Sequence, residues 1–496
     1  MYLQFFLLNN VFIQKTLVFI TKTMYNIYRK MVVKMVHSTR SLNKDRVSNA
    51  IIKGLAFDGG LFVFDEFKKI NLNELLDLDY KEIAFKVMSL YLDDFSPLDL
   101  KEMINKAYNE ENFSKGICQV TSFSNYSFLE LYHGPTASFK DMALTILPYE
   151  IEYAKKINNI NEETKIVVAT SGDTGSATLS GFRNSNASIT VLYPNLGVSK
   201  LQEKQMLYYE GRNKAIAING NFDDSQRIVK EILLKNKNFS AANSINIGRL
   251  IPQIVYYFYA YIKLIKNNVV KLNEMINVSV PTGNFGNILA GFIAKNMGLP
   301  IKKLICAANE NNVLTDFINT GIYDANRPFY KTHAPSMDIL VSSNLERLIY
   351  YFSNDVELVK KLYVDLEKNK RFELPLEFKE KLKDFKSFYS TDQEILRTIK
   401  DEFETHNYLI DPHTAVALDA YKKSKESLHT LIVSTASPYK FIDVIKQALN
   451  LKNEDEELVK EIFLTTKMEI PSSISVLLNK EYRKKVMEKE EVIKEI

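Results

Sequence analysis

The sequence predicts an α/β protein built on parallel β-sheets. Over residues 165–308, short apolar runs alternate with segments of helical periodicity, and this alternation is typical of strands connected by helices. Two glycine-containing loops, at residues 170–175 and 283–287, each lie between an expected strand and an expected helix. With 496 residues, the chain is long enough for two or three domains with a large core.

The individual elements follow from the same patterns. Short apolar runs predict strands at residues 128–131, 165–169, 188–192, 216–218, 278–281, 304–308 and 431–434. Helices are expected at residues 142–147, 176–182, 198–209, 222–234, 251–265 and 288–297, and from about residue 439. Most of residues 72–113, 340–405 and 467–496 is also predicted to be helical.

Composition and charge narrow the class of protein. The chain is 46% hydrophobic and 25% charged, as expected of a soluble globular protein. Its net charge is +4, but residues 1–34 hold five cations and no acid, so the remainder is close to neutral and gives no support for nucleic-acid binding. Cys118 and Cys306 have no metal-ligand spacing, and no metal site is expected. A reducing cytoplasm is consistent with this cysteine content.

Residues 1–34 differ from the rest of the chain. Residues 2–20 are mostly apolar, but five polar or charged residues interrupt them, which is poor for a membrane span. The charges follow the apolar run, which is the reverse of a signal peptide. Three interpretations remain: a weak membrane anchor, a targeting segment, or a start assigned too early, since Met31 and Met35 offer later starts. We favour the last and expect no membrane attachment.

The stretch from Tyr132 to Asp141 contains the strongest candidate for a catalytic residue. Gly134-Pro135 predicts a turn, and Thr136 and Ser138 are plausible helix caps, so Lys140 should lie near a helix start. The positive end of the helix dipole and the apolar neighbour Phe139 both disfavour an ammonium there. A lysine in this position is a candidate Schiff-base nucleophile, whereas the simpler alternative is an ordinary surface lysine.

Both glycine-containing loops are candidate anion sites. The loop Gly283-Asn284-Phe285-Gly286-Asn287 turns backbone N–H groups and a helix start toward a common point, which suits a phosphate. It matches neither the dinucleotide nor the NTPase fingerprint, and a tight turn without a ligand is the alternative. The second loop, residues 170–175, suits a substrate carboxylate; its Asp173 could contact a cofactor ring or simply cap the helix.

These motifs together resemble threonine synthases. The similarity lies in His-Gly-Pro-Thr-x-x-Phe-Lys-Asp at 133–141, Asp-Gly-Gly at 58–60, Ser-Gly-Asp-Thr-Gly at 171–175 and Gly-Asn-Phe-Gly-Asn at 283–287, as well as in residues 198–206, 220–224, 243–246, 411–416 and 434–436. The presence of Asp173 in the second loop resembles the pattern of the longer, yeast- and enterobacterial-like branch of this family. The resemblance implies a fold-type-II pyridoxal-phosphate (PLP) enzyme with two open parallel-sheet domains and a mainly helical N-terminal domain.

The resemblance also implies domain ranges and residue roles. The ranges are an extension at 1–34, an N-terminal domain at 35–120, a first α/β domain at 121–266 and a second at 267–496. Lys140 is implied as the catalytic residue and PLP anchor. The other implied cofactor ligands are Asp173, Gly283, Asn284, Phe285, Gly286, Asn287 and Thr435, with Thr435 at the ring nitrogen. The implied substrate ligands are Ser171, Gly172, Thr174, Asn243, Ser244, Arg249 and Lys200.

Three positions depart from the usual family pattern. Phe57 replaces a proline before Asp-Gly-Gly, Ile247-Gly248 replaces Trp-Ala before Arg249, and Ser437 replaces a histidine in Thr-Ala-His-Pro. Because Arg249 is retained, it can still bind a substrate phosphate. The Ser437 change affects expectations about the substrate and not about the cofactor.

The implied reaction converts O-phospho-L-homoserine and water into L-threonine and phosphate, the last step of threonine biosynthesis, in a cytoplasmic monomer or homodimer. A PLP-dependent phospho-lyase that releases 2-oxobutyrate would use the same lysine and cofactor. A PLP-binding protein without turnover and a membrane-attached protein are the remaining alternatives; the latter rests on residues 1–34 alone.

Overall fold

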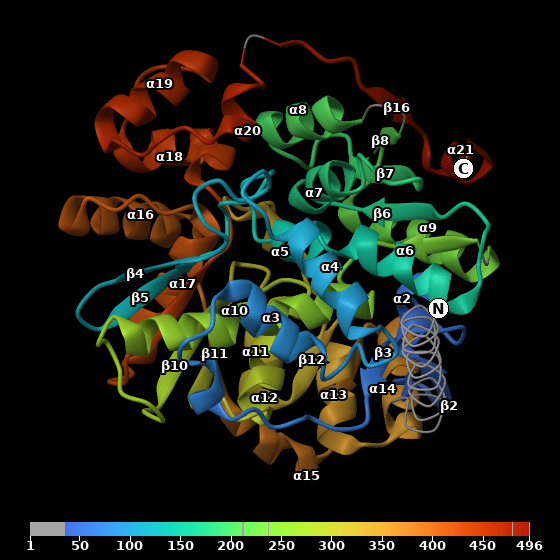
Figure 1. Ribbon diagram of the computed structural model, residues 1–496. Helices are drawn as coiled ribbons and strands as arrows, with labels where there is room; N and C mark the ends of the chain where they lie inside the picture. Colours follow the sequence, from blue (N-terminus) through green and yellow to red (C-terminus); the bar gives the residue numbers. More distant parts are fainter. Residues whose placement is uncertain (1–34, 211–212, 237, 479, 496) are drawn as a thin grey trace, which may run out of the picture.

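Two β-sheets organise the protein, as the computed structural model shows for residues 35–210, 213–236, 238–478 and 480–495 (Figure 1). The larger sheet has six strands in the order β14-β11-β10-β15-β5-β4. All of its neighbouring strands are parallel except β4 and β5. Its strands are β4 (Gln119–Ser122), β5 (Tyr126–Glu130), β10 (Ile276–Pro281), β11 (Ile301–Ala308), β14 (Phe385–Tyr389) and β15 (Thr430–Ser434).

The second sheet has five strands in the order β16-β8-β7-β6-β9, and all of its pairings are parallel. Its strands are β6 (Lys165–Ala169), β7 (Ser188–Pro194), β8 (Lys214–Ile218), β9 (Phe239–Ala241) and β16 (Lys485–Met487). The predicted α/β class with two parallel-sheet domains is therefore confirmed. Strand pairing crosses the predicted domain ranges, because β5 joins the sheet of residues 276–434 and β16 joins that of residues 165–241. The ranges themselves stay a prediction.

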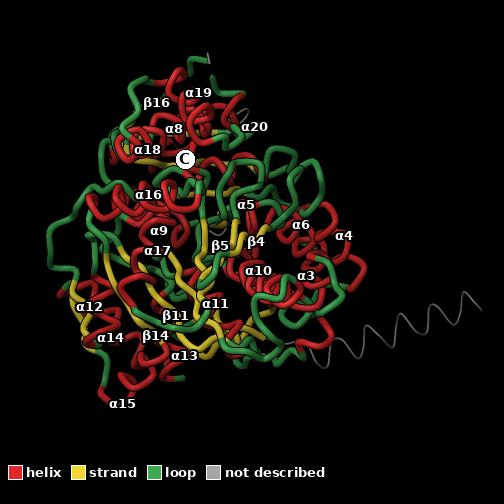
Figure 2. The backbone as a smooth tube through the Cα atoms, turned by 90° about the vertical axis from the view of Figure 1, so that its left-hand side faces the viewer, coloured by secondary structure: helices red, strands yellow, loops and turns green. Residues whose placement is uncertain are grey.

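Helices cover the sheets, and in Figure 2 the strands run between helices on either side. The helices that matter for the site are α5 (Asp141–Leu144), α7 (Asp173–Gly181), α8 (Lys200–Tyr209), α9 (Phe222–Lys235), α10 (Ile247–Lys266), α11 (Gly286–Asn296) and α17 (Pro412–Ser424). Others are α6 (Leu147–Asn158), α12 (Val313–Thr320), α13 (Leu345–Ser353), α14 (Val356–Asn369), α15 (Leu376–Lys379), α16 (Asp392–His406), α18 (Ile442–Leu449), α19 (Asp455–Thr466), α20 (Ser472–Ser475) and α21 (Lys489–Glu495).

The N-terminal domain corrects one prediction, because it is not mainly helical. Strands β1 (Met35–Ser38), β2 (Ser41–Arg46) and β3 (Phe62–Phe64) form an antiparallel sheet in the order β2-β1-β3. Helix α2 (Val47–Lys53) packs against β1 and β2, whereas α3 (Tyr80–Met88) packs on α10 and α4 (Pro97–Ala107) packs on α3 and α6. The strands are short, and β2 carries little apolar periodicity, so pairing between distant segments decides their structure.

The C-terminal segment and residues 340–405 also contain strands that periodicity did not predict. Residues 485–487 form β16 at the edge of the second sheet, and β14 lies at the edge of the larger one. The pair β12 (Ile322–Asp324) and β13 (Arg371–Glu373) forms a separate antiparallel ribbon. Edge strands bury little of their surface, so their apolar pattern is weak. Among the described residues, no helix is both long and apolar enough to cross a membrane. The interpretations of residues 1–34 lie outside the described part of the chain.

Helix α7 follows the loop at residues 170–175, here called the substrate loop, and packs tightly against α5, the helix that follows Lys140. A Cβ at Gly181 would lie 2.1 Å from the backbone oxygen of Leu144, so the two backbones would have to move apart. We expect Gly181→Ala to lower the free energy of unfolding by about 1–3 kcal/mol, measured by denaturant unfolding. Gly291→Ala is the control, because its Cβ would meet only side-chain atoms, at 3.2 Å. An equal loss in both variants would contradict this packing argument.

Candidate active site

A small pocket lies where β5, β10 and β15 of the larger sheet end. It brings together Lys140, the loop Gly283–Asn287, Ser244, Arg249 and Thr435, which the sequence placed in a common site. The remaining lining residues are Phe139, Gln253, Pro281, Thr282, Ile288, Ser336, Met337 and His413. Ligands commonly bind in α/β proteins at the carboxyl ends of parallel strands, so the position suits a functional site.

Backbone hydrogen bonds connect the loop that carries Lys140 to the chain segment that follows β15. The Phe139 amide donates to the Thr435 carbonyl (2.8 Å), and the Ser437 amide donates to the Ala137 carbonyl (3.0 Å). Ala137 takes a left-handed backbone conformation with φ 55°, which turns the chain toward α5. Lys140 itself occupies the N-cap position of α5, immediately before Asp141. The structure thus places Lys140 at a helix start and next to Thr435.

The predicted helix caps are not made. Neither Thr136 nor Ser138 caps α5; instead the Thr136 hydroxyl and amide donate to the two Asp141 carboxylate oxygens, at 2.6 and 2.8 Å. This contact closes the loop over a buried carboxylate, which a cap at Thr136 would not do. The Ser138 hydroxyl is buried and has no hydrogen-bond partner among the described residues.

The surroundings of Lys140 favour its neutral amine. Burial is the main cause that lowers its pKa from 10.5 to about 8, and the positive charges of Arg249 and Lys440 lower it further, whereas Asp173 opposes the shift. The ammonium lies 4.4 Å from the centroid of the Phe139 ring. A neutral amine at moderate pH is what a nucleophilic lysine needs.

This pKa predicts how the reactivity of Lys140 depends on pH. Because the amine loses its proton near pH 8, the apo-protein should become more reactive toward an aldehyde as the pH rises through 8, and not only near 10.5. The measurement is the rate of imine formation with PLP between pH 6 and 11, followed by the visible absorbance of the imine. A midpoint near 10.5 would contradict the assigned environment.

The loop at residues 283–287 forms the start of α11. Phe285 is its N-cap and adopts a left-handed conformation with φ 61°, so the first amides of the helix face the pocket side of the loop. The Asn287 side-chain oxygen accepts hydrogen bonds from the Tyr256 and Tyr257 hydroxyls, both at 2.6 Å. These two bonds fix the orientation of the Asn287 amide, and its Nδ2 is buried without a hydrogen-bond partner in the described part of the chain.

The pocket has the donors that a phosphorylated cofactor needs. Three of its lining residues hold buried polar atoms that lack a partner among the described residues: Arg249 Nε, Asn287 Nδ2 and Ser336 Oγ. No carboxylate lines the pocket, whereas Lys140 and Arg249 contribute cations. A helix start with free donors beside two cations binds an anion. The residues present therefore fit PLP.

Arg249 is a buried cation that has no carboxylate partner among the residues the structure describes. It is 2% exposed, and among the described residues its side chain makes one hydrogen bond, from Nη1 to the Ala242 carbonyl (2.6 Å). Burial lowers the pKa of Arg249 to about 10. An unpaired buried charge is costly, so its presence beside Lys140 points to an anionic ligand.

The loop at residues 171–174 lies at the start of α7, next to the pocket and not on its wall. Gly172 is the N-cap with φ 131°, a conformation suited to glycine, and Asp173 begins the helix. Asp173 is 4% exposed and forms an ion pair with Lys440 (2.9 Å). Ser171 and Thr174 keep part of their surface exposed. Asp173 therefore does not cap the helix, and a contact with the cofactor stays a prediction.

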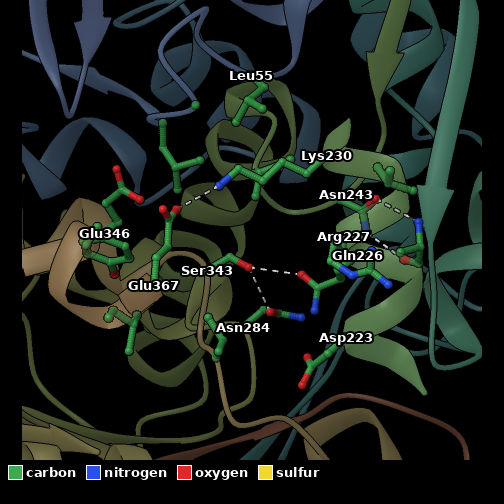
Figure 3. A pocket seen from close by; sticks show the side chains of 18 of the residues that line it. Leu55, Asp223, Gln226, Arg227, Lys230, Asn243, Asn284, Ser343, Glu346 and Glu367 are labelled. Carbon is green, nitrogen blue, oxygen red and sulfur yellow. Dashed lines mark hydrogen bonds and ion pairs between the residues drawn. The ribbon is translucent and has the colours of Figure 1, made fainter. Parts of the chain in front are cut away.

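The other implied substrate ligands separate into two groups. Asn243 and Ser244 border a cavity of about 480 Å³, lined by apolar and charged side chains, that shares Ser244 and Asn284 with the pocket (Figure 3). The Asn243 side chain also holds the Ala169 backbone at the end of β6, at 2.7 and 3.1 Å. Lys200, by contrast, has a side chain 79% exposed and pairs with Asp455 (3.3 Å). The structure does not bring Lys200 to the pocket.

Figure 3 shows charged side chains of both signs around this cavity, with Arg227 and Lys230 from α9 on one side and Glu346 and Glu367 from α13 and α14 on the other. Ser343 Oγ lies 3.3 Å from Asn284 Oδ1 and 3.4 Å from Gln226 Oε1, and Lys230 pairs with Glu367 across the cavity at 3.5 Å. A cavity next to the pocket with charged side chains of both signs in its lining suits the approach of a small charged substrate.

Two pocket neighbours were missed as site residues by the sequence analysis. His413 lines the pocket; its Nδ1 bonds Asp411 (2.9 Å) and its Nε2 accepts from the Ser336 amide (3.1 Å). Lys440 reaches Asp173 from the segment after β15. The Asp-Pro-His-Thr motif was a usable signal for His413. Nothing local distinguishes Lys440 from the many other lysines, because its partners are distant in sequence.

Comparisons with known proteins agree with this arrangement. A family model described as "Pyridoxal-phosphate dependent enzyme" matches residues 126–435. Models described as "Threonine synthase N terminus" and "Threonine synthase, C-terminal" match residues 36–108 and 414–496. Threonine synthase from Saccharomyces cerevisiae is 34% identical over 462 residues, which cover 84% of this chain and 89% of that protein. Human threonine synthase-like 1 is 38% identical over 449 residues, and the match spans 60% of its length.

Solved structures show the same similarity over nearly the whole chain. The crystal structure of threonine synthase from yeast matches with a TM-score of 0.82 at 33% identity, covering 93% of this chain and 98% of that one. PLP-bound threonine synthase from Brucella melitensis matches with a TM-score of 0.81 at 32% identity and the same coverage. With its lysine loop, the glycine-containing loop at the start of α11 and these matches in sequence and structure, the chain belongs to the threonine synthase family of PLP-dependent, fold-type-II enzymes.

Proposed function

We propose that this chain converts O-phospho-L-homoserine and water into L-threonine and phosphate. The observation that carries the proposal is Arg249, a buried guanidinium with an unpartnered Nε in the same pocket as Lys140. The α11 start suits one phosphate, and Arg249 is a second anion-binding group beside it. A PLP enzyme whose substrate also carries a phosphate needs two such groups.

The cofactor would be held by the residues at the carboxyl ends of β10 and β15. Gly283–Asn287 would bind its phosphate, Lys140 its aldehyde carbon, and Thr435 its ring nitrogen. When bound, PLP supplies an electron sink that stabilises negative charge at the substrate carbon next to the amino group. A hydroxyl partner at the ring nitrogen leaves that nitrogen unprotonated, so the sink is weaker than with an aspartate.

Lys140 is the proton carrier in this proposal. Once the substrate's amino group has taken its place, Nζ is free to accept a proton from Cα and to return protons at the neighbouring carbons. The pKa of about 8 lets one group perform both transfers near neutral pH. Loss of the γ-phosphate and addition of water at Cβ complete the reaction.

The substrate's two anionic ends would bind to different segments. The amides and hydroxyls of Ser171, Gly172 and Thr174, at the start of α7, suit its carboxylate. Arg249, with Asn243 and Ser244 beside it, suits its phosphate. Asp173 is not assigned to the carboxylate, because a second negative charge there would repel it.

The test is product analysis with purified protein, PLP and O-phospho-L-homoserine in ¹⁸O-labelled water. The proposal requires threonine and phosphate in equal amounts, with the label in the threonine hydroxyl, since that oxygen comes from water. Phosphate with 2-oxobutyrate would identify a phospho-lyase instead. An imine absorbance without any phosphate release would indicate a PLP-binding protein without turnover.

A further inference from the structure

Lys440 is a fully buried lysine whose ammonium connects three parts of the active-site region. It is 1% exposed and belongs to the short turn that follows Thr435 and Ser437. Its Nζ lies 2.9 Å from each of three oxygens: the Thr136 carbonyl, Gln205 Oε1 and Asp173 Oδ1. An ammonium has three hydrogens to donate, so its hydrogen-bonding capacity is used completely.

The three oxygens come from three segments that are separate in sequence. Thr136 belongs to the loop that carries Lys140, Asp173 begins helix α7, and Gln205 lies on α8. The Gln205 side chain also donates to the Thr136 carbonyl (3.3 Å). Lys440 therefore holds the lysine loop, the substrate loop and α8 in one arrangement.

The ammonium also keeps a buried carboxylate charged. Burial alone raises the pKa of Asp173, but the charge of Lys440 and the hydrogen bonds from Lys440 and Gln202 outweigh it, and the net effect is a lowered pKa. The Gln202 amide donates to the same carboxylate oxygen at 2.8 Å. His413, across the pocket, also stabilises the charge of Asp173.

The charges that act on Lys140 come from several elements. Arg249 on α10 and Lys440 disfavour its ammonium, whereas Asp173 on α7 favours it. The effects of Lys440 and Asp173 on the pKa of Lys140 oppose each other, so the two together shift that pKa less than either would alone. Removing one member of the pair should therefore shift the pKa of Lys140.

We infer that Lys440 is a positioning residue for the reaction: its ammonium fixes the substrate loop against the lysine loop and holds the Asp173 carboxylate charged beside Lys140. The inference depends on the proposed function only for its turnover readout, because the measurement of imine formation with PLP needs no substrate. A purely structural ion pair is the competing explanation, and it would affect stability alone.

The main experiment compares Lys440→Met, Asp173→Asn and the double variant with the wild type. The readout is the pH midpoint of imine formation between the apo-protein and PLP, which needs no substrate. Lys440→Met leaves Asp173 uncompensated near Lys140, so the midpoint should rise by about one pH unit or more; Asp173→Asn should lower it. The double variant should return near the wild-type value, because both charges are gone.

Turnover and chemical rescue form the second readout. We expect Lys440→Met to lower kcat/KM for O-phospho-L-homoserine by about 10²-fold. In Lys440→Ala, propylammonium carries the deleted atoms and should raise turnover at least about tenfold, whereas propanol, which lacks the charge, should not. Lys156→Ala is the matched control, because Lys156 is an exposed lysine that pairs with Glu152 (2.7 Å); it should leave the midpoint and turnover unchanged.

The inference is overturned if the single variants lower the melting temperature but keep the wild-type pH midpoint. If the Lys440 variants do not fold, Asp173→Asn decides alone, because it keeps the shape of the side chain: an unchanged midpoint overturns the inference. A wild type that forms the imine but makes no threonine would refute the proposed function and leave this test intact.

Discussion

Lys140→Ala is expected to lose the visible imine absorbance of the holoenzyme and to lower turnover by about 10³-fold or more. The variant removes both the covalent attachment of PLP and the group assigned to move protons between substrate carbons. Absorbance spectra of the wild type and the variant with added PLP, followed by phosphate release from O-phospho-L-homoserine, measure both effects.

Lys140→Arg is the matched control for charge. It keeps a cation in the pocket, but a guanidinium does not lose its proton and does not form the imine. We expect it to be as inactive as Lys140→Ala. A visible imine band in either variant would show that another lysine anchors the cofactor and would contradict the assignment of Lys140.

Arg249→Met is expected to lower kcat/KM for O-phospho-L-homoserine by about 10²-fold, because it removes the cation assigned to the substrate phosphate. The free energy of unfolding of the apo-protein should stay equal or rise, since a buried guanidinium without a carboxylate partner destabilises the fold in the absence of ligand. The pKa of Lys140 should rise, because Arg249 lowers it.

Arg347→Met is the control for burial of an arginine. Arg347 is 0% exposed, as deeply buried as Arg249, but its guanidinium bonds the carbonyls of Phe62 (2.9 Å) and Ile245 (2.6 Å). It also donates to the Asn344 side chain. Its removal leaves these acceptors unpaired and should lower stability clearly. A similar loss of stability in Arg249→Met, with kcat/KM unchanged, would make Arg249 a structural residue.

Local patterns in the sequence predicted the principal strands and helices and some of the residues that line the pocket, namely Lys140 and the loop Gly283–Asn287. Three places in the chain share one pattern, in which a short strand is followed by a turn and a helix. They are the loop before Lys140, the loop at residues 283–287 and the segment after β15. Such junctions depend on neighbouring residues, through hydrophobic periodicity and turn-forming residues. The resemblance added the roles, and strand geometry then brought the three junctions to one edge of the larger sheet.

The predictions that the structure contradicts concern segments whose local sequence signal for secondary structure or contacts is weak. The antiparallel sheet of the N-terminal domain, β14 and β16 are edge or short strands, whose stability comes from pairing with distant segments. The expected cap by Thr136 was replaced by its bonds to Asp141, because that carboxylate is buried and needs donors. Lys200 was expected at the substrate, but it lies on the exposed side of α8.

By itself, the sequence determined the α/β class, the lysine loop and the glycine-containing loop at residues 283–287, because the strands, turns and helices that identify them depend on residues close in sequence. Only the tertiary structure decided which polar groups are paired. The Lys440 ammonium meets the Thr136 carbonyl across 304 residues of chain, and two tyrosines orient Asn287. Arg249 has no carboxylate partner within the described ranges. The physical reason is that charge and hydrogen-bond balance in a buried site depends on every group packed around it, wherever that group lies in the chain.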